Sequence, residues 1–136
     1  MKTLAALVAL SFGLAAHSSP VPTNPNVTPH DPLPARVLDC GAAIITAIGD
    51  RFQGTPNADT GTSVTLNNGG YVTSYDLVPS ISNSKVVQHV FVCLMYIPDP
   101  AKCPPGDKRG RVYTMTNLTT LESWTLSDSE HMCGGA

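Results

Sequence analysis

Three residues of this chain carry the side chains that acid–base catalysis needs: His89, Glu122 and His131. In RNA cleavage, one such group removes the proton of the 2′-hydroxyl and another protonates the leaving oxygen, while cations such as Arg109 or Arg111 stabilise the phosphorane. The competing interpretation is that His89 is a core histidine with satisfied hydrogen bonds and that His131 lies on a loop. The sequence contains no nucleophile elbow, zinc-protease, P-loop, EF-hand or dinucleotide motif. We therefore expect no cofactor, and an enzyme is predicted only as an alternative.

A local cluster of positive charge lies in residues 102–111 of a chain whose formal net charge is −2. Its members are Lys102, Lys108, Arg109 and Arg111. Prolines surround the cluster and Cys103 lies within it, so we predict a loop of fixed shape that binds an anion or a partner; an ordinary solvated loop is the alternative. The mildly acidic chain as a whole has no global attraction for nucleic acid or anionic membranes. Nucleic acid is expected as a partner only under the ribonuclease interpretation.

Aromatic residues at strand-like positions are a third candidate. On an exposed sheet they would bind a sugar or a peptide, but aromatic side chains also fill the pleated surface of a strand, and we expect core packing here. The residues are Tyr71, Tyr75, Tyr113 and Trp124.

Four cysteines predict two disulfides, because an even number in a secreted chain is typical of a disulfide framework. Zinc sites use closely spaced pairs, whereas the nearest cysteines here are ten residues apart, so no metal site is predicted. Of three possible pairings, the proline-rich stretch between Cys93 and Cys103 favours a local bridge, which leaves Cys40 with Cys133. The longer bridge would contribute about 4–5 kcal/mol in the chain-entropy model.

The N-terminus has the layout of a secretory signal peptide over residues 1–18. Lys2 precedes an apolar run from Leu4 to Leu14, and small residues follow. The run is too short to cross a bilayer. Residues 19–36 hold six of the twelve prolines and predict a disordered leader, which places a disulfide-stabilised domain over residues 37–136. We therefore predict a secreted monomer without a membrane span.

Two N-x-S/T sequons lie outside the signal, at Asn26 and Asn117. Both agree with passage through the secretory pathway, where glycans are attached to such asparagines. The sequence therefore predicts a glycoprotein with these two acceptor sites.

The first element that would position these residues is a predicted helix over residues 42–52. Its apolar residues stand at offsets 0, 1, 4 and 8, which form one face of a helix. They are Ile44, Ile45, Ile48 and Phe52. β-branched residues are poor helix formers, so a strand is the rival interpretation.

About five antiparallel strands are predicted to follow, which gives a β-rich α+β fold. Residues 63–66 and 71–77 predict a hairpin around an Asn-Asn-Gly-Gly turn, and residues 111–116 and 121–126 predict a second. Residues 86–97 are apolar on both faces and predict a central strand covered on each side.

The sequence as a whole resembles the small secreted proteins of filamentous fungi, many of which are candidate effectors. The resemblance is one of plan: an Ala- and Leu-rich signal (MKTLAALVALSFGLAA), a short Pro-rich leader, and a four-cysteine domain that ends in Cys133-Gly134-Gly135-Ala136. It implies a role outside the producing cell, commonly in a host plant and often without enzymatic activity.

Within that class, a helix followed by antiparallel strands is similar to ribonuclease-like effectors and fungal guanyl-specific ribonucleases. Those enzymes have a Thr-His-Thr-Gly-like segment before the last cysteine. This chain has Ser129-Glu130-His131-Met132-Cys133 there, so no catalytic residue is transferred.

Together these features predict an effector-like protein that binds a host or extracellular macromolecule, through residues 102–111 and the neighbouring strand surface. Delivery into host cells is one route to such a partner. A secreted ribonuclease-like enzyme is the first alternative, and a structural or surface-associated protein is the second.

Overall fold

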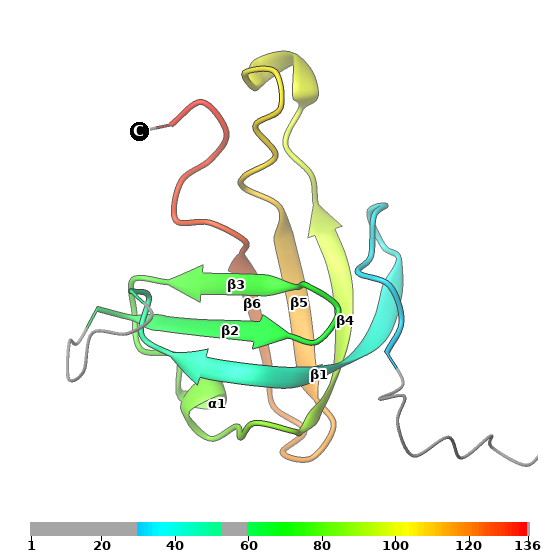
Figure 1. Ribbon diagram of the computed structural model, residues 1–136, viewed down its shortest axis with the longest axis vertical. Coiled ribbons are helices and arrows are strands. Elements are labelled where there is room, and N and C mark those ends of the chain that lie inside the picture. The colour runs from blue at the N-terminus through cyan, green and yellow to red at the C-terminus, as the bar shows by residue number, and fades with distance from the viewer. Residues whose placement is uncertain (1–29, 53–59, 136) are drawn as a thin grey trace, which may run out of the picture.

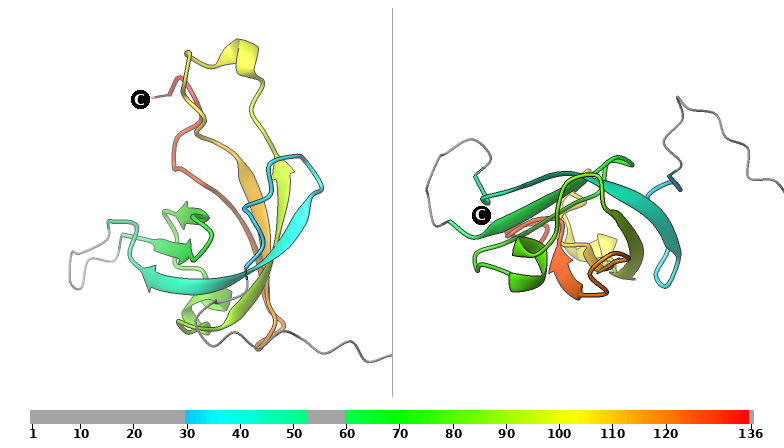
Figure 2. Two further views of the ribbon diagram at one scale, coloured as in Figure 1. Left: turned by 45° about the vertical axis from the view of Figure 1, so that its right-hand side comes forward. Right: turned by 90° about the horizontal axis from the view of Figure 1, so that it is seen from below.

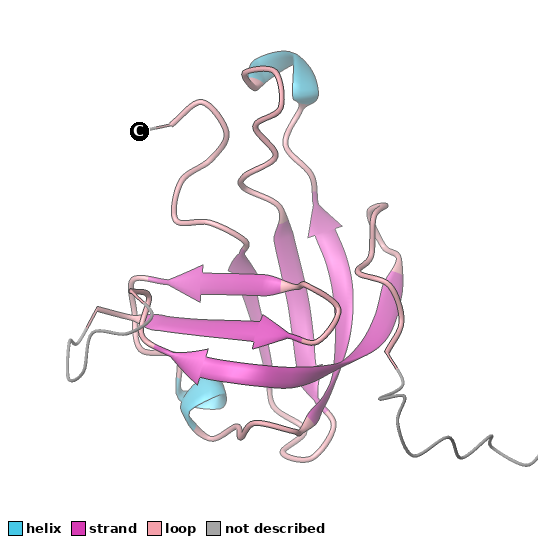
Figure 3. Cartoon of the chain, in the orientation of Figure 1, coloured by secondary structure: helices cyan, strands magenta, loops and turns pink. Residues whose placement is uncertain are grey.

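The computed structural model describes residues 30–52 and 60–135, which form a β-barrel with a projecting arm (Figure 1). These residues contain six antiparallel strands, which close in the order β1-β2-β3-β6-β5-β4. The strands are β1 (Cys40–Gly49), β2 (Thr62–Leu66), β3 (Tyr71–Ser74), β4 (His89–Tyr96), β5 (Val112–Asn117) and β6 (Ser123–Ser127). The helical structure of the described chain is limited to one α-helical turn, α1 (Pro79–Ser82), and one 3-10 turn, η1 (Pro100–Lys102) (Figure 3).

The predicted α+β fold is wrong, because β1 occupies the place of the helix expected over residues 42–52. β1 pairs with β2 on one side and with β4 on the other. Its register with β2 shifts between Ile45 and Ala47, as at a β-bulge, where one strand has an extra residue. Ile45 is therefore buried before the shift, and Ile48 packs against the core after it. Core-facing residues three positions apart are typical of a helix, which explains the wrong prediction, although the β-branched residues favour a strand.

Both predicted hairpins are confirmed. β2 and β3 pair across residues 67–70, where the N–H of Leu66 donates to the carbonyl of Gly70. Gly69 in this turn has a φ of +84°, a conformation that glycine adopts without strain. β5 and β6 form the second hairpin, with register pairs from Val112–Ser127 to Thr116–Ser123.

β4 lies between β1 and β5, but the prediction that both of its faces are covered is wrong. Val90, Val92 and Leu94 point into the barrel and are fully buried. On the outer face, Phe91 and Met95 are 45% and 42% exposed. A barrel made of one layer of strands covers only the inner face of each strand, so the outer face of β4 meets solvent.

The interior of the barrel is a packed hydrophobic core. Its buried residues are Ala43, Ile45, Val64, Leu66, Val72, Ile81, Val90, Val92, Leu94, Tyr113, Met115 and Trp124. Ile81 comes from α1, which lies at the end of the barrel opposite the arm (Figure 1). Full burial of a large apolar side chain contributes about 1.5–3 kcal/mol, so this core is the main source of the barrel's stability.

The arm consists of residues 97–111, between β4 and β5, and residues 128–135, which follow β6. Both segments extend away from the same end of the barrel (Figure 2). Pro98 and Gly110 are the buried residues of the described arm, and η1 has none. The arm therefore lacks a hydrophobic core of its own.

Two disulfides are present as predicted, but their pairing differs from the expected one. Cys40 is bonded to Cys93, and Cys103 is bonded to Cys133. β1 and β4 are neighbours in the barrel, and their register places Cys40 opposite Cys93, with 4.1 Å between the two Cα atoms. Because Cys93 has this partner within the sheet, Cys103 is left to join the two segments of the arm.

Residues 31–34, within the predicted leader, pack against the barrel. The N–H of Asp31 donates to the carbonyl of Ala42, and the N–H of Ala42 donates to Oδ2 of Asp31. Pro34 is buried, and Leu33 packs against the core. The predicted signal peptide lies outside the described residues. None of the helices in the described ranges is long and apolar enough to cross a membrane.

Candidate functional site

The three predicted acid–base residues do not share one site. His89 is exposed at the start of β4, so it is not a core histidine, and its carbonyl accepts a hydrogen bond from Leu118 in the turn after β5. Glu122 lies at this same end, where both of its carboxylate oxygens accept from Asn83 Nδ2 at 3.1 and 3.2 Å. His131 follows the opposite end of β6. A strand rises about 3.3 Å per residue, so the five residues of β6 alone place about 16 Å between Glu122 and His131.

Two of the four predicted binding cations stabilise the arm itself, and Arg109 is the first. Its Nε and Nη2 donate to the two carboxylate oxygens of Asp107 at 3.0 and 2.8 Å, and the N–H of Gly134 donates to the same carboxylate at 3.1 Å. The Arg109 side chain, followed by the backbone N–H groups of Gly134 and Arg109, holds the pKa of Asp107 well below its usual range. Asp107 thus links the two segments of the arm beside the Cys103–Cys133 bridge.

Arg111 is the second structural cation. Its backbone N–H and that of Gly110 donate to Oδ1 of Asp128 at 3.1 and 2.7 Å. Burial raises the pKa of the Asp128 carboxyl, and these two N–H donors oppose the rise. Burial also raises the pKa of Tyr113, against a hydrogen bond from the Arg111 side chain. Arg111 therefore belongs to the junction between arm and barrel.

Lys102 and Lys108 are exposed, as is Arg109, but unlike Arg109 they form no ion pair within the described residues. Neither lysine has a carboxylate within 4.0 Å in that part of the chain. Residues 97–111 carry four cations and two aspartates, a net charge of +2. Asp128 and Glu130 in residues 128–135 offset this charge near the barrel. The charges of the whole arm therefore cancel, and the positive charge of the two lysines is a local feature of its surface.

The four predicted aromatics divide into two pairs. Tyr113 and Trp124 are core residues with exposures of 2% and 5%, as the packing interpretation expected. Tyr71 is half-buried, and Tyr75 is 53% exposed, so these two remain candidates for ligand contact.

A pocket lies beside Tyr71, where β3 and β6 diverge. These two strands share only the register pair Thr73–Ser127, whereas the other neighbouring strands share four to six pairs. The pocket has a volume of about 270 Å³. We call it the seam pocket, and its lining residues are Arg51, Phe52, Tyr71, Thr73, Asp128, Ser129, Glu130 and His131.

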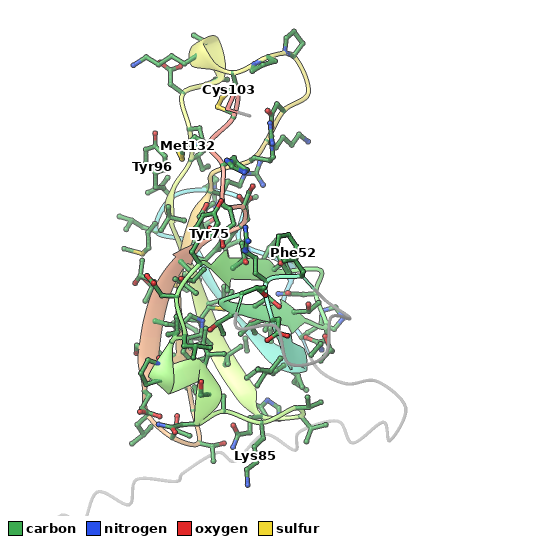
Figure 4. All side chains as sticks on the ribbon, turned by 90° about the vertical axis from the view of Figure 1, so that its left-hand side faces the viewer. Phe52, Tyr75, Lys85, Tyr96, Cys103 and Met132 are labelled. Atoms are coloured by element: carbon green, nitrogen blue, oxygen red, sulfur yellow. A yellow bond between two sulfur atoms is a disulfide. The ribbon has the colours of Figure 1, made fainter. Side chains whose placement is uncertain are left out.

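Arg51 is the cation of the seam pocket. Its guanidinium carbon lies 4.0 Å from the centroid of the Phe52 ring and 4.2 Å from that of Tyr75, and its Nε donates to the carbonyl of Thr60 at 3.1 Å. Figure 4 shows Phe52 and Tyr75 on the same side of the molecule, near the base of the arm. Such stacking is attractive and restricts the side chain.

The seam pocket includes residues that the sequence analysis missed. Arg51 and Phe52 lie at the end of the predicted helix, and Glu130 lies in the segment before Cys133 without a predicted role. Glu130 accepts a hydrogen bond from the hydroxyl of Thr73, 57 residues away in the chain. Only the closure of the barrel brings these residues together, and no local motif signals it.

Asn117, a predicted glycosylation site, is fully buried. Its Nδ2 donates to Ser84 Oγ and Gln88 Oε1, both at 2.8 Å, and its Oδ1 accepts from the N–H groups of Thr119 and Thr120. A glycan bonded to Nδ2 would displace these partners, so the folded barrel has no room for one at Asn117. Asn26 lies outside the described residues.

The described residues contain no cluster of three or more His, Cys, Asp or Glu side chains arranged to hold a metal ion. No protein-family model, curated protein or solved structure matches the chain. The functional assignment therefore rests on the chemistry of the arm and of the seam pocket.

Proposed function

We propose that this chain is a secreted, effector-like protein that acts outside the producing cell by binding an acidic host or extracellular macromolecule. The contact surface is the exposed side of the arm, centred on Lys102 and Lys108. Binding, rather than catalysis, is the activity proposed.

The proposal is supported by the two exposed lysines, which have no ion-pair partner among the described residues and lie on an arm of restrained conformation. The Cys103–Cys133 bridge, the Asp107–Arg109 ion pair and the hydrogen bonds of Asp128 all restrain the arm. A surface that is ordered before binding loses less conformational entropy when the partner binds. Exposed lysines at such a surface attract an acidic partner and accelerate its association.

The geometry gives no support to the ribonuclease alternative. That mechanism needs two acid–base groups and a cation around one phosphate. His89 and Glu122 lie at one end of β6, and His131 lies beyond the other end. Of the cations considered for the phosphorane, Arg109 is paired with Asp107, and the Arg111 side chain is hydrogen-bonded to Tyr113.

The test is the binding of the mature protein to two acidic polymers that contain no uronic acid, dextran sulfate and polyglutamate, at low and moderate salt. Lys102→Glu with Lys108→Glu should abolish binding, because the charge of the contact surface is reversed. Arg109 is unsuitable for this test, because its loss would also release Asp107 and loosen the arm. The control is Lys85→Glu, which changes an exposed lysine at the opposite end of the molecule from Cys103 (Figure 4).

Binding that survives Lys85→Glu and is lost in the double variant supports the proposal. Equal loss in both variants would show a general charge effect and contradict it. The absence of binding by the wild-type protein to either polymer would also contradict an acidic partner.

A further inference from the structure

The seam pocket holds a cation, two carboxylates and aromatic rings within one small space. Its residues come from the segment after β1, from β3 and from the segment after β6. The lysines of the proposed contact surface are not among them. What binds in this pocket is therefore a separate question from what binds to the arm.

Arg51 is suited to a carboxylate. Its guanidinium faces are covered by Phe52 and Tyr75, and it has no carboxylate within 4.0 Å among the described residues. A guanidinium is planar and binds a carboxylate with two parallel N–H···O bonds. Because the rings already fix this side chain, little rotamer freedom is lost when an anion binds.

The two carboxylates that line the pocket are suited to hydroxyl donors. Glu130 accepts one hydrogen bond, from Thr73, and a carboxylate has acceptor capacity for several more. Asp128 uses Oδ1 for Gly110 and Arg111, and its Oδ2 has no donor within the described chain. These acceptors would repel a second anionic group, so the ligand has its acid at Arg51 and neutral hydroxyls elsewhere.

The aromatic rings and the volume narrow the ligand further. Phe52 is 53% exposed and Tyr71 is half-buried, so both offer apolar surface to the C–H face of a ring. A volume of about 270 Å³ lies just below the range of about 300–1,000 Å³ that is typical of small-molecule sites. The pocket therefore fits one small ring better than an extended chain.

We infer that the seam pocket binds a uronic acid, a sugar that carries one carboxylate, several hydroxyls and an apolar ring face. The carboxylate pairs with Arg51, the hydroxyls donate to Glu130 and Asp128, and the ring packs against Tyr71 or Phe52. A neutral sugar has no carboxylate to pair with Arg51. A phosphorylated compound has more negative charge, which Glu130 and Asp128 would repel. A fatty acid has no hydroxyl groups to donate to these two carboxylates.

The test is calorimetric titration of the oxidised mature protein with glucuronic acid and with glucose, which differ in having a carboxylate or a CH₂OH group. Glucuronic acid should bind at least about tenfold more tightly, the effect of a charge-assisted hydrogen bond. Arg51→Gln should remove this preference. Arg36→Gln, which removes the same charge from an 85% exposed side chain paired with Asp39, should retain it.

Equal affinity for the two sugars, no binding of either, or a preference that survives Arg51→Gln would overturn the inference. The comparison of the two sugars uses the wild-type protein, so it remains decisive even if Arg51→Gln does not fold. Lys102→Glu with Lys108→Glu should leave glucuronic acid binding unchanged. Failure of the pocket and failure of the arm surface are therefore observed separately.

Discussion

The barrel and the arm each contain one disulfide, but the other interactions that stabilise the two regions differ. The barrel has a continuous hydrophobic core and six strands paired around it, whereas the buried residues of the described arm are Pro98 and Gly110. In place of a core, the arm has charged and backbone hydrogen bonds around Asp107 and Asp128. Regions with few buried contacts open at low free energy, so the same kind of bridge should have different consequences in the two regions.

The largest expected effect comes from removing each bridge in turn. Cys40→Ala with Cys93→Ala opens a separation of 53 residues, and Cys103→Ala with Cys133→Ala opens one of 30. The chain-entropy relation gives losses of about 4 and about 3.5 kcal/mol in the free energy of unfolding. Urea denaturation measures both losses.

Hydrogen exchange should separate these two variants even where their stabilities are similar. Without Cys103–Cys133, the amides of residues 97–111 and 128–135 should exchange rapidly. The amides of β4 and β5 should still exchange only through global unfolding. Without Cys40–Cys93, protection should fall together across the barrel. If the arm remains as protected as β4 after its bridge is removed, the contrast drawn between the two regions is incorrect.

The next effect is expected at Asn117, within the barrel. Asn117→Ala removes four hydrogen bonds and leaves the N–H groups of Thr119 and Thr120 without this acceptor, whereas Ser84 and Gln88 keep their bonds to Ser80 and Lys85. We expect a loss of about 3 kcal/mol in the free energy of unfolding, because each hydrogen bond contributes about 1 kcal/mol. Thermal or urea unfolding measures it.

The matched control is Thr119→Ala, which destroys the same sequon at an exposed position. It should change stability by less than about 0.5 kcal/mol. Its mass should fall only by the Thr-to-Ala difference, since no glycan is expected at Asn117. A folded protein with a glycan on Asn117 would disprove the assignment of this residue to the interior.

A smaller effect is expected at Gly110, within the arm. Gly110 has a φ of +96°, and a Cβ there would lie 2.8 Å from Met132 Sδ and 3.2 Å from Met132 Cα. Gly110→Ala should cost about 1–3 kcal/mol and should appear as faster exchange in the arm. Gly106→Ala is the control, since Gly106 has a φ of +84° with no atom within 4 Å of the Cβ position. Equal effects at both glycines would show that the Met132 contact is unimportant.

The smallest effect is a loosening of the arm in acid. An unfolded aspartate has a pKa of about 3.9, and the folded pKa of Asp107 is lower. Its stabilising contribution is therefore complete above the unfolded value and is lost as the pH falls through the folded value. The NMR signals of the Arg109 and Gly134 amides, followed from pH 5 to 2, should change only well below pH 3.9. A midpoint at or above that value would contradict the proposed network, and Asp107→Asn should remove the transition.

The sequence predicted the parts of the fold that depend on local chemistry. The Asn-Asn-Gly-Gly turn and the run around Asn117 marked both hairpins, because turn residues act over a few positions. β1 was predicted as a helix because the register shift after Ile45 disturbs the alternation that normally marks a strand. The disulfide pairing depended on which strands become neighbours, and nothing near Cys93 indicates that Cys40 lies across from it.

The candidate site was predictable to a similar extent. The clustering of Lys102 and Lys108 is visible in the sequence, whereas the ion pair of Arg109 and the hydrogen bond between Arg111 and Tyr113 are not. The seam pocket draws on the segment after β1, on β3 and on the segment after β6, so its residues become a group only when the barrel closes. The same holds for Asn117, whose sequon reads as a surface feature until its burial is known.

The division into barrel and arm is tested most directly by peptide mapping without reduction. Trypsin cleaves after Arg51, Lys85, Lys102 and Arg111, among other sites, and so places the four cysteines in four different peptides: 37–51, 86–102, 103–108 and 112–136. The structure predicts that 37–51 is linked to 86–102 and that 103–108 is linked to 112–136. A link between 86–102 and 103–108, or between 37–51 and 112–136, would contradict the architecture described for both regions.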